Sequence, residues 1–306
     1  MRILVTGGAG FLGSALANTL AQQGHEVLVV DDLSAGDLTR LHKQVLFHRG
    51  SVLDRPKLWT LLHGVECVYH LAARVLVAES ILYPYDYNKV NVGGTVMLLE
   101  AMRDLGIPRL VIASSGAIYG EQNEQPISEA APPNPRSPYA VSKLAAEYYA
   151  QTIGAIWGIA TTTLRIFNVY GPGQSLPPSH PPVVPRFLQQ ASGDGSVVIF
   201  GDGTQTRDFV YLDDVVTALI TAGTTDGIGG QTFNIGSGRD TSINQLSKII
   251  LAITKSESNI IYNAAGSVGV SRLQANITAA QKYLGYTPQV SLESGLRQTL
   301  HADARF

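Results

Sequence analysis

Short runs of branched apolar residues alternate with longer amphipathic stretches over about the first 170 residues. The runs read RILVTG, EVLVVDD, VLFHRG, CVYHLAA, RLVIASS and TTTLRIFN, and the stretches with helical character are 11–23, 55–63, 84–105 and 137–157. Apolar runs without polar alternation are typical of strands that are covered on both faces. The pattern therefore predicts an α/β fold with a doubly wound parallel sheet, the Rossmann arrangement.

The pattern changes after Asn168. Residues 171–185 contain six of the 15 prolines, so we predict that they form neither helix nor central strand. Farther along the chain, helices are expected near 185–192, 212–222, 242–254, 276–284 and 291–302, and short strands near 197–200, 208–211 and 231–235.

Two structural units follow from this pattern. The chain of 306 residues is 45% hydrophobic and 15% charged, which is enough to bury a large core. We predict a sheet domain of residues 1–168 with a return segment at about 205–240. A smaller C-terminal lobe of about 169–204 and 241–306 is expected to close over the sheet.

Composition limits the partners and the compartment. Twenty-two basic and 24 acidic residues give a net charge of -2 without any block of like charge, so a nucleic-acid binder is not expected. The seven histidines form no close ligand cluster and predict no metal site, and Cys67 is expected to be a small buried hydrophobe. Neither a signal peptide nor a run of 18 apolar residues is present, so no membrane partner and a cytoplasmic location are expected.

Glycines connect the first predicted strand and helix. Gly7, Gly10 and Gly13 lie in ILVTGGAGFLGS, at positions where side chains would keep the backbone away from a pyrophosphate. The second strand ends in Asp31 and Asp32, where a carboxylate can bind ribose hydroxyls and repel a 2′-phosphate. Together these features predict a dinucleotide site and favour NAD over NADP.

A set of motifs along nearly the whole chain carries a family resemblance. The motifs are TGGAGFLGS, DDLSAG, HLAA, NVGGT, SSGAIYGE, SPYAVSK, RIFNVYGPGQ, GDGTQTRDFVYLDD, FNIGSG and LGYTP. In this order they resemble the extended short-chain dehydrogenase/reductases, specifically the NAD-dependent nucleotide-sugar epimerases and dehydratases. The resemblance implies contacts with NAD from Gly7, Gly10, Phe11, Leu12, Gly13, Asp31, Asp32, Leu33, Ser34, Gly36, Ser51, Val52, Leu71, Ala72, Ala73, Asn91, Ser114, Tyr139, Lys143 and Phe167. Ser51 stands where the epimerases usually have Asp, which removes or weakens a contact to the adenine amino group.

Ser115, Tyr139 and Lys143 are the predicted catalytic residues. Ser115 follows the apolar run RLVIAS and so lies at a strand end, while Tyr139 and Lys143 share one face of the next helix. A base near neutrality needs the phenol pKa to fall from ~10 by about 3 units, roughly 4 kcal/mol, and an ammonium about 4 Å away supplies about that much. An oxidised nicotinamide nearby would add to it. Tyr85 and Lys89 have the same spacing without an upstream serine, and we expect them to be structural or surface residues.

The resemblance also implies a reaction. In the epimerases the tyrosinate removes the 4′-hydroxyl proton while hydride passes from C4′ to NAD, and hydride then returns to the other face of a 4-keto sugar. Gly116 and Ala117 occupy the places where dehydratases carry Asp and Glu and decarboxylases carry Glu. The chain is therefore expected to catalyse 4-epimerisation of a UDP-sugar. A nucleotide-sugar 4-ketoreductase would look the same, and an NAD-sensing protein without turnover is a third reading.

Substrate contacts are also implied by the resemblance. Asn168 and Arg207 are expected to hold the diphosphate, the latter as a bidentate guanidinium unless it pairs with Asp208 or Asp213. Phe200 and Phe209 are candidates to flank the base, although core packing is an equal alternative. The substrate-binding set is Arg74, Ser115, Tyr139, Asn168, Val183, Phe200, Arg207, Arg272 and Leu273.

Several of these positions differ from the family pattern. The usual Arg-x-Gly-Asp is replaced by AAGSVGVSR, so Arg272 is the candidate second phosphate contact. Leu273 aligns with the position that controls bulk at the sugar C2, so an N-acetyl sugar remains a possible substrate. Arg74 would face a carboxylate or phosphate, so a uronic-acid substrate also remains possible. The family also pairs helices 84–105 and 137–157 between subunits, which predicts a homodimer.

Overall fold

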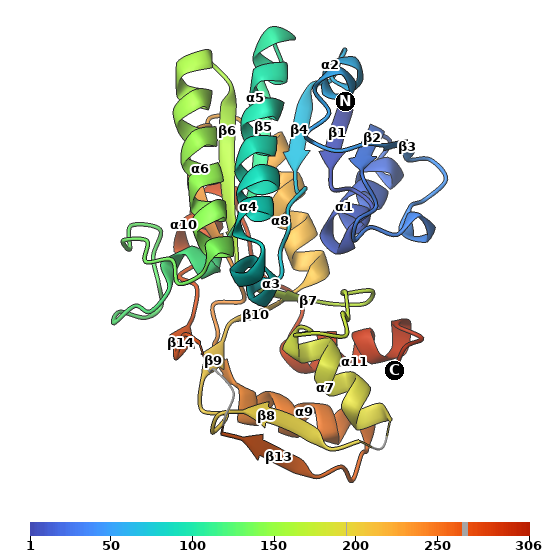
Figure 1. Cartoon of the computed structure of the whole chain (residues 1–306), viewed down its shortest axis with the longest axis vertical. Helices are drawn as coiled ribbons and strands as arrows, with labels where there is room; N and C mark the ends of the chain where they lie inside the picture. The colour runs from blue at the N-terminus through green and yellow to red at the C-terminus, as the bar shows by residue number, and fades with distance from the viewer. Residues whose placement is uncertain (194, 265–268) are drawn as a thin grey trace.

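A seven-stranded parallel sheet forms the centre of the larger part of the molecule (Figure 1). The computed structural model describes residues 1–193, 195–264 and 269–306. In sheet order the strands are β11 (Thr232–Ile235), β6 (Ala160–Ile166), β5 (Arg109–Ser115), β4 (Cys67–His70), β1 (Arg2–Thr6), β2 (Glu26–Asp31) and β3 (Leu46–Arg49). The order reverses direction between β1 and β4, which confirms the predicted doubly wound parallel sheet.

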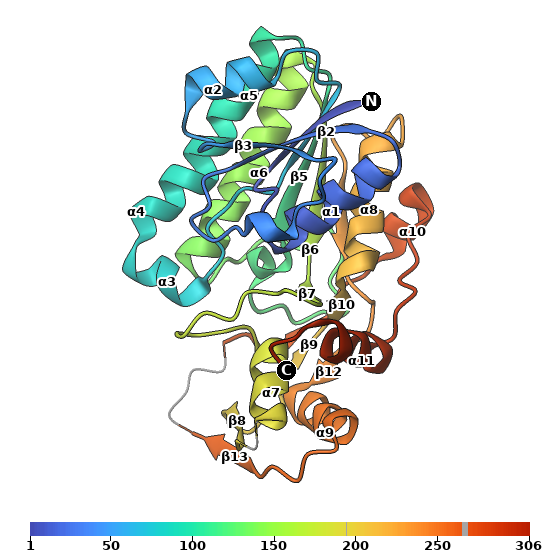
Figure 2. The same ribbon diagram turned by 90° about the vertical axis from the view of Figure 1, so that its right-hand side faces the viewer.

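Helices cover both faces of this sheet (Figure 2). On one face lie α1 (Phe11–Gln22), α8 (Leu212–Thr224) and α10 (Thr278–Leu284), and on the other lie α2 (Arg55–Leu61), α5 (Gly94–Asp104) and α6 (Pro138–Trp157). Two separate apolar clusters fill the layers, as the uninterrupted apolar strands predict. Cys67 is fully buried in one of them, which confirms its expected packing role.

The predicted helix at 84–105 is interrupted. It consists of α4 (Pro84–Tyr87), the π-helix η2 (Asn88–Gly93) and α5, and it follows an unpredicted helix α3 (Val77–Leu82). A π-turn inside a longer helix is uncommon and often lies beside a functional site.

The smaller part of the molecule lies below the carboxyl edge of the sheet in Figure 1. It contains α7 (Val183–Ser192), α9 (Ile243–Thr254) and α11 (Leu292–Ala302), packed around a cluster that includes Phe187, Leu246 and Leu296. Its strand pairs are β7 (Asn168–Tyr170) with β10 (Phe209–Tyr211), and β8 (Val197–Phe200) with β13 (Ile260–Asn263). A third small sheet joins β12 (Thr241–Ser242), β9 (Thr206–Arg207) and β14 (Arg272–Leu273). The sequence pattern did not predict β7, β9, β12, β13 or β14.

One prediction about the proline-rich segment is wrong. Residues 171–185 were expected to contain no helix, yet α7 begins at Val183 and includes Pro185. A proline in the first helical turn loses no intrahelical hydrogen bond, because the N–H groups there have no partner within the helix.

Candidate active site

A cavity of about 490 Å³ opens at the carboxyl edge of the sheet. Its wall combines the segments that follow β1, β2, β4, β5 and β6 with the first turns of α6. These segments meet because parallel strands bring their carboxyl ends to one edge. All the residues predicted to contact NAD line this cavity except Leu33 and Asn91.

The glycine loop has the shape that a pyrophosphate requires. Gly7 has a φ of 69°, and a Cβ there would lie 2.7 Å from the backbone of Ala72. A Cβ on Gly13 would lie 2.1 Å from the carbonyl oxygen of Gly7. Helix α1 begins after Gly10 without a side-chain cap, so its first-turn N–H groups at the cavity wall are available to an anion. The loop therefore fits the diphosphate of a dinucleotide.

Asp31 holds the loop next to this cradle. Its Oδ2 accepts a hydrogen bond from the Ala9 N–H at 3.0 Å, and its Oδ1 accepts one from the Leu33 N–H at 2.9 Å. Leu33 is thus turned into the loop, with a φ of 63°, and does not reach the cavity wall. The Asp31 carboxylate itself does line the cavity. Its lone pairs can accept hydrogen bonds from the ribose hydroxyls.

Arg40 is a wall residue that the sequence did not reveal. It ends the short 3₁₀ turn η1 (Leu38–Arg40) and forms an ion pair of 3.7 Å with Asp37. Gln174 and Ser175 also line the cavity from the proline-rich segment. No periodic pattern marks such residues, because loops rather than strand ends bring them to the cavity.

Ser115, Tyr139 and Lys143 all line the cavity. Ser115 is the last residue of β5, and its Oγ accepts a hydrogen bond from the Ala117 N–H at 3.2 Å, which caps the 3₁₀ helix η3 (Gly116–Tyr119). Tyr139 stands in the first turn of α6, near enough to Ser115 for the serine to lower the pKa of the phenol. Lys143 is buried one turn farther along the same helix. The three side chains therefore converge, as the strand-end argument predicts.

The pKa of Tyr139 differs from the sequence-based expectation. Burial raises the pKa of Tyr139, and the hydrogen bond to Ser115 opposes that rise only in part. Burial also lowers the pKa of Lys143 to about 8. We expected Lys143 alone to bring the phenol pKa toward neutrality. In the protein without NAD this expectation is wrong, because burial disfavours both the phenolate of Tyr139 and the ammonium of Lys143.

The second Tyr-x-x-x-Lys pair is a surface feature. Tyr85 is 73% exposed in α4, Lys89 is exposed in η2, and neither lines the cavity. Equal sequence spacing therefore gives two different environments.

Asn91 lies behind the cavity wall. Its Nδ2 donates to the Arg74 carbonyl at 3.0 Å and to the Ser142 Oγ at 2.9 Å, while its Oδ1 accepts from the Arg74 N–H at 2.8 Å. The Ser142 Oγ donates in turn to the carbonyl of Tyr139. Asn91 therefore fixes the backbone beside the site, and the buried side chain is occupied in doing so.

Arg74 lines the cavity with carboxylates already around it. One guanidinium nitrogen lies 2.7 Å from Glu79 and another lies 4.0 Å from Asp86. The guanidinium also lies over the ring of Tyr87, whose edge meets the ring of Tyr139 at a centroid distance of 6.5 Å. The positive charge of Arg74 is thus compensated within the protein.

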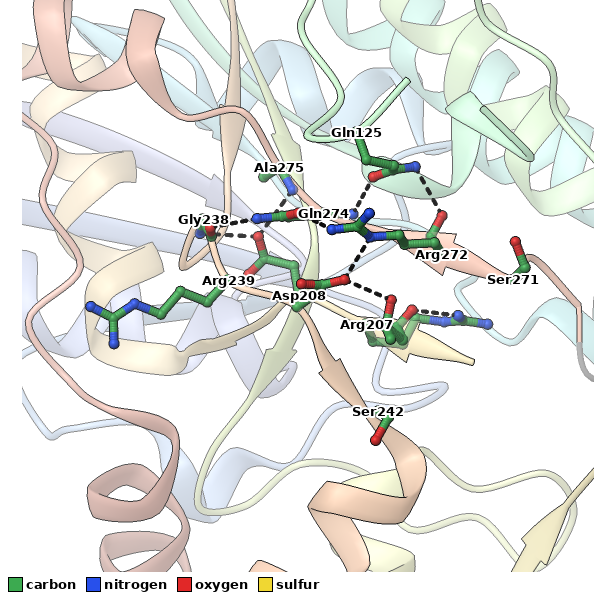
Figure 3. A network of polar contacts seen from close by, with 12 residues as sticks. Gln125, Arg207, Asp208, Gly238, Arg239, Ser242, Ser271, Arg272, Gln274 and Ala275 are labelled. Atoms are coloured by element: carbon green, nitrogen blue, oxygen red, sulfur yellow. Dashed lines mark hydrogen bonds and ion pairs between the residues drawn. The ribbon is translucent and has the colours of Figure 1, made fainter. Parts of the chain in front are cut away.

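A second, more open cavity of about 1140 Å³ lies between the 201–206 loop and β14. Figure 3 shows how Arg272 is held at its wall: the Nε lies 2.7 Å from Asp240, and an Nη donates to Gln274 at 2.9 Å. Asp240 also accepts a hydrogen bond from the Thr206 hydroxyl at 3.0 Å. The replaced Arg-x-Gly-Asp segment spans 264–272, of which 265–268 lie outside the described residues. Arg272 thus borders the cavity in a fixed orientation.

Asp208 organises the backbone beneath this cavity (Figure 3). The fully buried carboxylate accepts hydrogen bonds from the N–H and hydroxyl of Ser237 at 2.6 Å each, and from the N–H groups of Gly238 and Ala275 at 3.0 Å each. Burial nevertheless raises the pKa of Asp208. This carboxylate joins three loops that are far apart in the sequence, and its role was missed because no local pattern marks a loop anchor.

The remaining predicted substrate contacts differ in their placement. Asn168 lines the first cavity, whereas Val183, Phe200, Arg207 and Leu273 each directly adjoin a wall residue in the sequence without lining either cavity in the described part of the chain. Phe200 is 37% exposed and has the Arg186 guanidinium 4.8 Å from its ring centroid, whereas Phe209 is buried against Tyr170. Of the two candidate base-flanking rings, Phe200 is thus the accessible one.

Arg207 does not take the ion-pair alternative with Asp208. Its Nη1 donates to the Thr206 carbonyl at 2.7 Å, and the carboxylate of Asp208 is occupied by Ser237, Gly238 and Ala275. The pKa of Arg207 is lowered by burial and supported by the charge of Glu121.

Across 1–193, 195–264 and 269–306, no group of three or more His, Cys, Asp or Glu side chains is arranged to hold a metal ion. No helix in these same ranges is long and apolar enough to span a membrane.

The fold and the glycine cradle define the class of protein: an α/β protein with a dinucleotide site at the carboxyl edge of its sheet. Residues 3–236 match the model of the NAD dependent epimerase/dehydratase family, and the chain belongs to this family. A UDP-glucose 4-epimerase of Mycolicibacterium smegmatis is 37% identical over 307 residues, which cover 98% of this chain and 97% of the relative.

Solved structures show the same similarity. A UDP-glucose 4-epimerase of Thermotoga maritima with UDP-glucose superposes with a TM-score of 0.95 at 38% identity, covering 99% of this chain and 98% of that one. A UDP-glucuronic acid 4-epimerase of Bacillus cereus in complex with UDP-glucuronic acid and NAD has a TM-score of 0.91 at 32% identity, covering 99% and 98%.

Proposed function

We propose that the protein is a UDP-sugar 4-epimerase that uses NAD. The observation that carries this proposal is the convergence of Ser115, Tyr139 and Lys143 in the cavity that also contains the glycine cradle. Gly116 and Ala117 follow Ser115 directly, so the places that carry extra carboxylates in dehydratases and decarboxylases have no acid or base here. Similarity to 4-epimerases over nearly the whole chain supports the same reaction.

Each of the three side chains has a distinct role in this proposal. Tyr139 removes the proton of the sugar 4′-hydroxyl and later returns it, while Ser115 donates a hydrogen bond to the same oxygen. Lys143 supplies positive charge that favours the phenolate. Bound NAD supplies an acceptor for the C4′ hydride and then the donor that returns it to the other face of the 4-keto sugar. General acid–base transfer by a positioned group contributes about 10²–10⁴ in rate.

The nucleotide part of the substrate is assigned to the second cavity. Arg207 and Arg272 carry the positive charges near it, and both project from the small sheet of β9 and β14. Asn168 at the first cavity would contact the diphosphate between sugar and nucleoside. Phe200, accessible on one side and backed by Arg186, would stack on the base.

The surroundings of Arg74 favour a neutral sugar. Glu79 and Asp86 compensate its guanidinium, so this residue offers little free charge to a uronate carboxylate. Leu273 occupies the position that is expected to limit bulk near C2 of the sugar. It is a residue of medium size, and it is buried in the cluster with Phe167. We therefore rank UDP-glucose and UDP-galactose ahead of their uronate and N-acetyl analogues.

A screen of UDP-sugars followed by anomeric-proton NMR tests the function. Purified protein, without added cofactor, is expected to interconvert UDP-glucose and UDP-galactose. A lack of turnover on these, the uronates and the N-acetyl sugars would contradict the proposal. Stoichiometric consumption of NADH would instead identify a 4-ketoreductase.

We also propose a homodimer formed through the helices of 84–105 and 137–157, with the adjoining α3 added to this face by the structure. Large apolar side chains are exposed on these neighbouring helices, among them Ile81, Leu82, Tyr85, Tyr148 and Ile156. A cluster of such residues is typical of a subunit interface. Sedimentation in an analytical ultracentrifuge is expected to give a dimer; a monomer at all concentrations would contradict this.

The division into units is proposed as in the sequence analysis. Residues 1–168 with about 205–240 would form the NAD-binding domain, and about 169–204 with 241–306 the nucleotide-sugar lobe. The packing of α8 and β11 on the large sheet supports the return segment, while α10 also packs there although it lies outside that segment. Limited proteolysis would locate the boundary. The cytoplasmic location stays a prediction.

A further inference from the structure

A pair of buried charges lies directly behind Lys143. Glu147 is completely buried, and both of its carboxylate oxygens accept hydrogen bonds from the guanidinium of Arg165. The shortest contact is 2.6 Å, from Nη2 to Oε1. The remaining Arg165 nitrogen donates to the Tyr119 hydroxyl at 2.7 Å and to the Glu129 carbonyl at 3.0 Å. The Glu147 side chain is completely buried and that of Arg165 is only 7% exposed, so their positions are fixed by the protein.

The fold places this pair next to the reacting groups. Lys143 and Glu147 are four residues apart on the buried face of α6, so their side chains are neighbours on one face of the helix. Arg165 lies on β6 and pairs in register with Ser114 of β5, the residue before Ser115. The Glu147 carboxylate is thus on the same helix as Tyr139, two turns farther from the cavity.

The charges that face Lys143 come from two elements. Burial lowers the pKa of Lys143, and the charge of Glu147 on α6 favours the ammonium and opposes that effect in part, which leaves the pKa at about 8. His70 on β4 also faces Lys143, but burial and the lysine charge lower the pKa of His70 to about 3, so it is neutral at working pH. Arg165 on β6 is paired with Glu147, and Tyr139 lies one turn before Lys143 on α6. Among the described residues, Glu147 is therefore the negative charge that supports the ammonium.

We propose that Glu147 is a positioning residue for the reaction: held by Arg165, its carboxylate keeps Lys143 charged so that Lys143 can stabilise the Tyr139 phenolate. The inference rests on the proposed role of Lys143 in 4-epimerisation. Glu147 touches neither substrate nor cofactor and acts only through Lys143. A purely structural role, in which the pair simply ties α6 to β6, is the alternative that the test must separate.

The charge state of Lys143 can be measured directly. Lys143 is the only buried lysine of seven among the described residues, so ¹³C-labelled lysine gives one distinct titrating NMR signal, assigned with Lys143→Arg. In Glu147→Gln we expect the pKa of Lys143 to fall by about one unit, because an opposite charge one helical turn away is lost. An unchanged lysine titration in a folded Glu147→Gln protein would overturn the proposal.

Two further variants separate charge from structure. Arg165→Met leaves Glu147 without its partner, so the melting temperature falls as in Glu147→Gln, but the pKa of Lys143 is expected to rise. The double variant Glu147→Gln/Arg165→Met removes both charges; part of the stability returns while the pKa of Lys143 stays low. Shifts of the lysine pKa in the same direction in both single variants would indicate a structural role only and would refute the proposal.

Kinetics give an independent measurement. In Glu147→Gln the alkaline limb of the plot of kcat against pH is expected to shift to lower pH by about one unit, as the pKa of Lys143 does. The value of kcat near pH 8 therefore falls by five- to ten-fold, with KM nearly unchanged. Glu147→Asp should restore part of kcat. The lysine titration needs no turnover, so failure of the epimerase assignment and failure of this inference are distinguishable.

Discussion

The two cavities are built in different ways. The cofactor cavity takes Gly7, Asp31, Leu71 and Ser115 from the carboxyl ends of β1, β2, β4 and β5, and the hydrogen bonds of the sheet set the spacing of these ends. The second cavity takes its wall from loops, which depend on the buried carboxylate of Asp208 and on the Asp240–Arg272 pair. A site on strand ends is rigid because the sheet is rigid, whereas a site on loops is only as rigid as a few side-chain anchors. Substitutions should therefore affect rate in the first cavity and stability or affinity in the second.

The largest effect is expected at Tyr139. Tyr139→Phe removes the proton-transfer group and should lower kcat by about 10²–10⁴, with an unchanged melting temperature because the ring remains. Tyr85→Phe is the matched control, since Tyr85 has the same spacing to a lysine but is exposed. Full activity of Tyr139→Phe, measured by coupled assay of the epimer formed, would contradict the assignment.

Asp208→Asn should reveal the dependence of the second cavity on one anchor. The amide can no longer accept all four hydrogen bonds, and removal of a buried charged acceptor is expected to cost about 3 kcal/mol of unfolding free energy. Asp202→Asn on the neighbouring exposed loop should cost much less. Urea unfolding measures both, and equal losses would show that Asp208 is no special anchor.

The pH dependence of kcat tests the first cavity. Burial lowers the pKa of Lys143 to about 8, so the ammonium that supports the phenolate is lost as pH rises through that value. Activity should decline above pH 8 by about tenfold per unit. The lowered pKa of Lys143 also reduces the free energy of unfolding below pH 8. Between pH 8 and the ordinary lysine pKa this free energy should rise with pH, because the unfolded chain binds more protons than the folded protein there. A kcat that is flat from pH 7 to about 10 would refute this.

Arg272→Met should raise KM for the UDP-sugar by about five- to tenfold, the effect of one partly exposed ionic contact, with little change in kcat. Arg239→Met is the control, because the Arg239 side chain points away from this network in Figure 3. Initial-rate kinetics on both variants give the comparison. A fall in kcat without a change in KM would place Arg272 outside the nucleotide site.

The smallest effect is expected at the C-terminus. Asp303 accepts a hydrogen bond from the Gly173 N–H at 2.8 Å, and Arg305 donates to the Gln174 carbonyl at 2.8 Å. Gln174 lines the cofactor cavity. Asp303→Asn should therefore speed the release of NAD by about two- to threefold, because the acceptor of the Gly173 hydrogen bond loses its charge. Arg297→Gln, in an exposed ion pair on α11, should leave it unchanged. The rate is measured by diluting the protein and assaying the released NAD enzymatically, by its reduction to NADH, after removal of the protein.

Prediction from the sequence succeeded where local pattern and sheet geometry act together. The six apolar runs gave six strands of the large sheet, and the short strand expected near 231–235 is its seventh. The position of Ser115 at a strand end was enough to bring it together with Tyr139. It failed where a partner distant in sequence decides the outcome. Asp208 and the β12–β9–β14 sheet join segments at least 29 residues apart, and no periodic signal marks them.

The amino-acid sequence by itself determined the doubly wound sheet, the glycine cradle and the identity of the serine, tyrosine and lysine. These follow from strand periodicity, from the room that only glycine leaves and from residue chemistry. The tertiary structure alone decided that Tyr139 is partly buried at the cavity and Tyr85 is exposed, that burial raises the phenol pKa, and that Glu147 and Arg165 lie behind Lys143. The physical reason is that solvent exclusion and charge pairing depend on packing between distant segments, which spacing along one chain does not record.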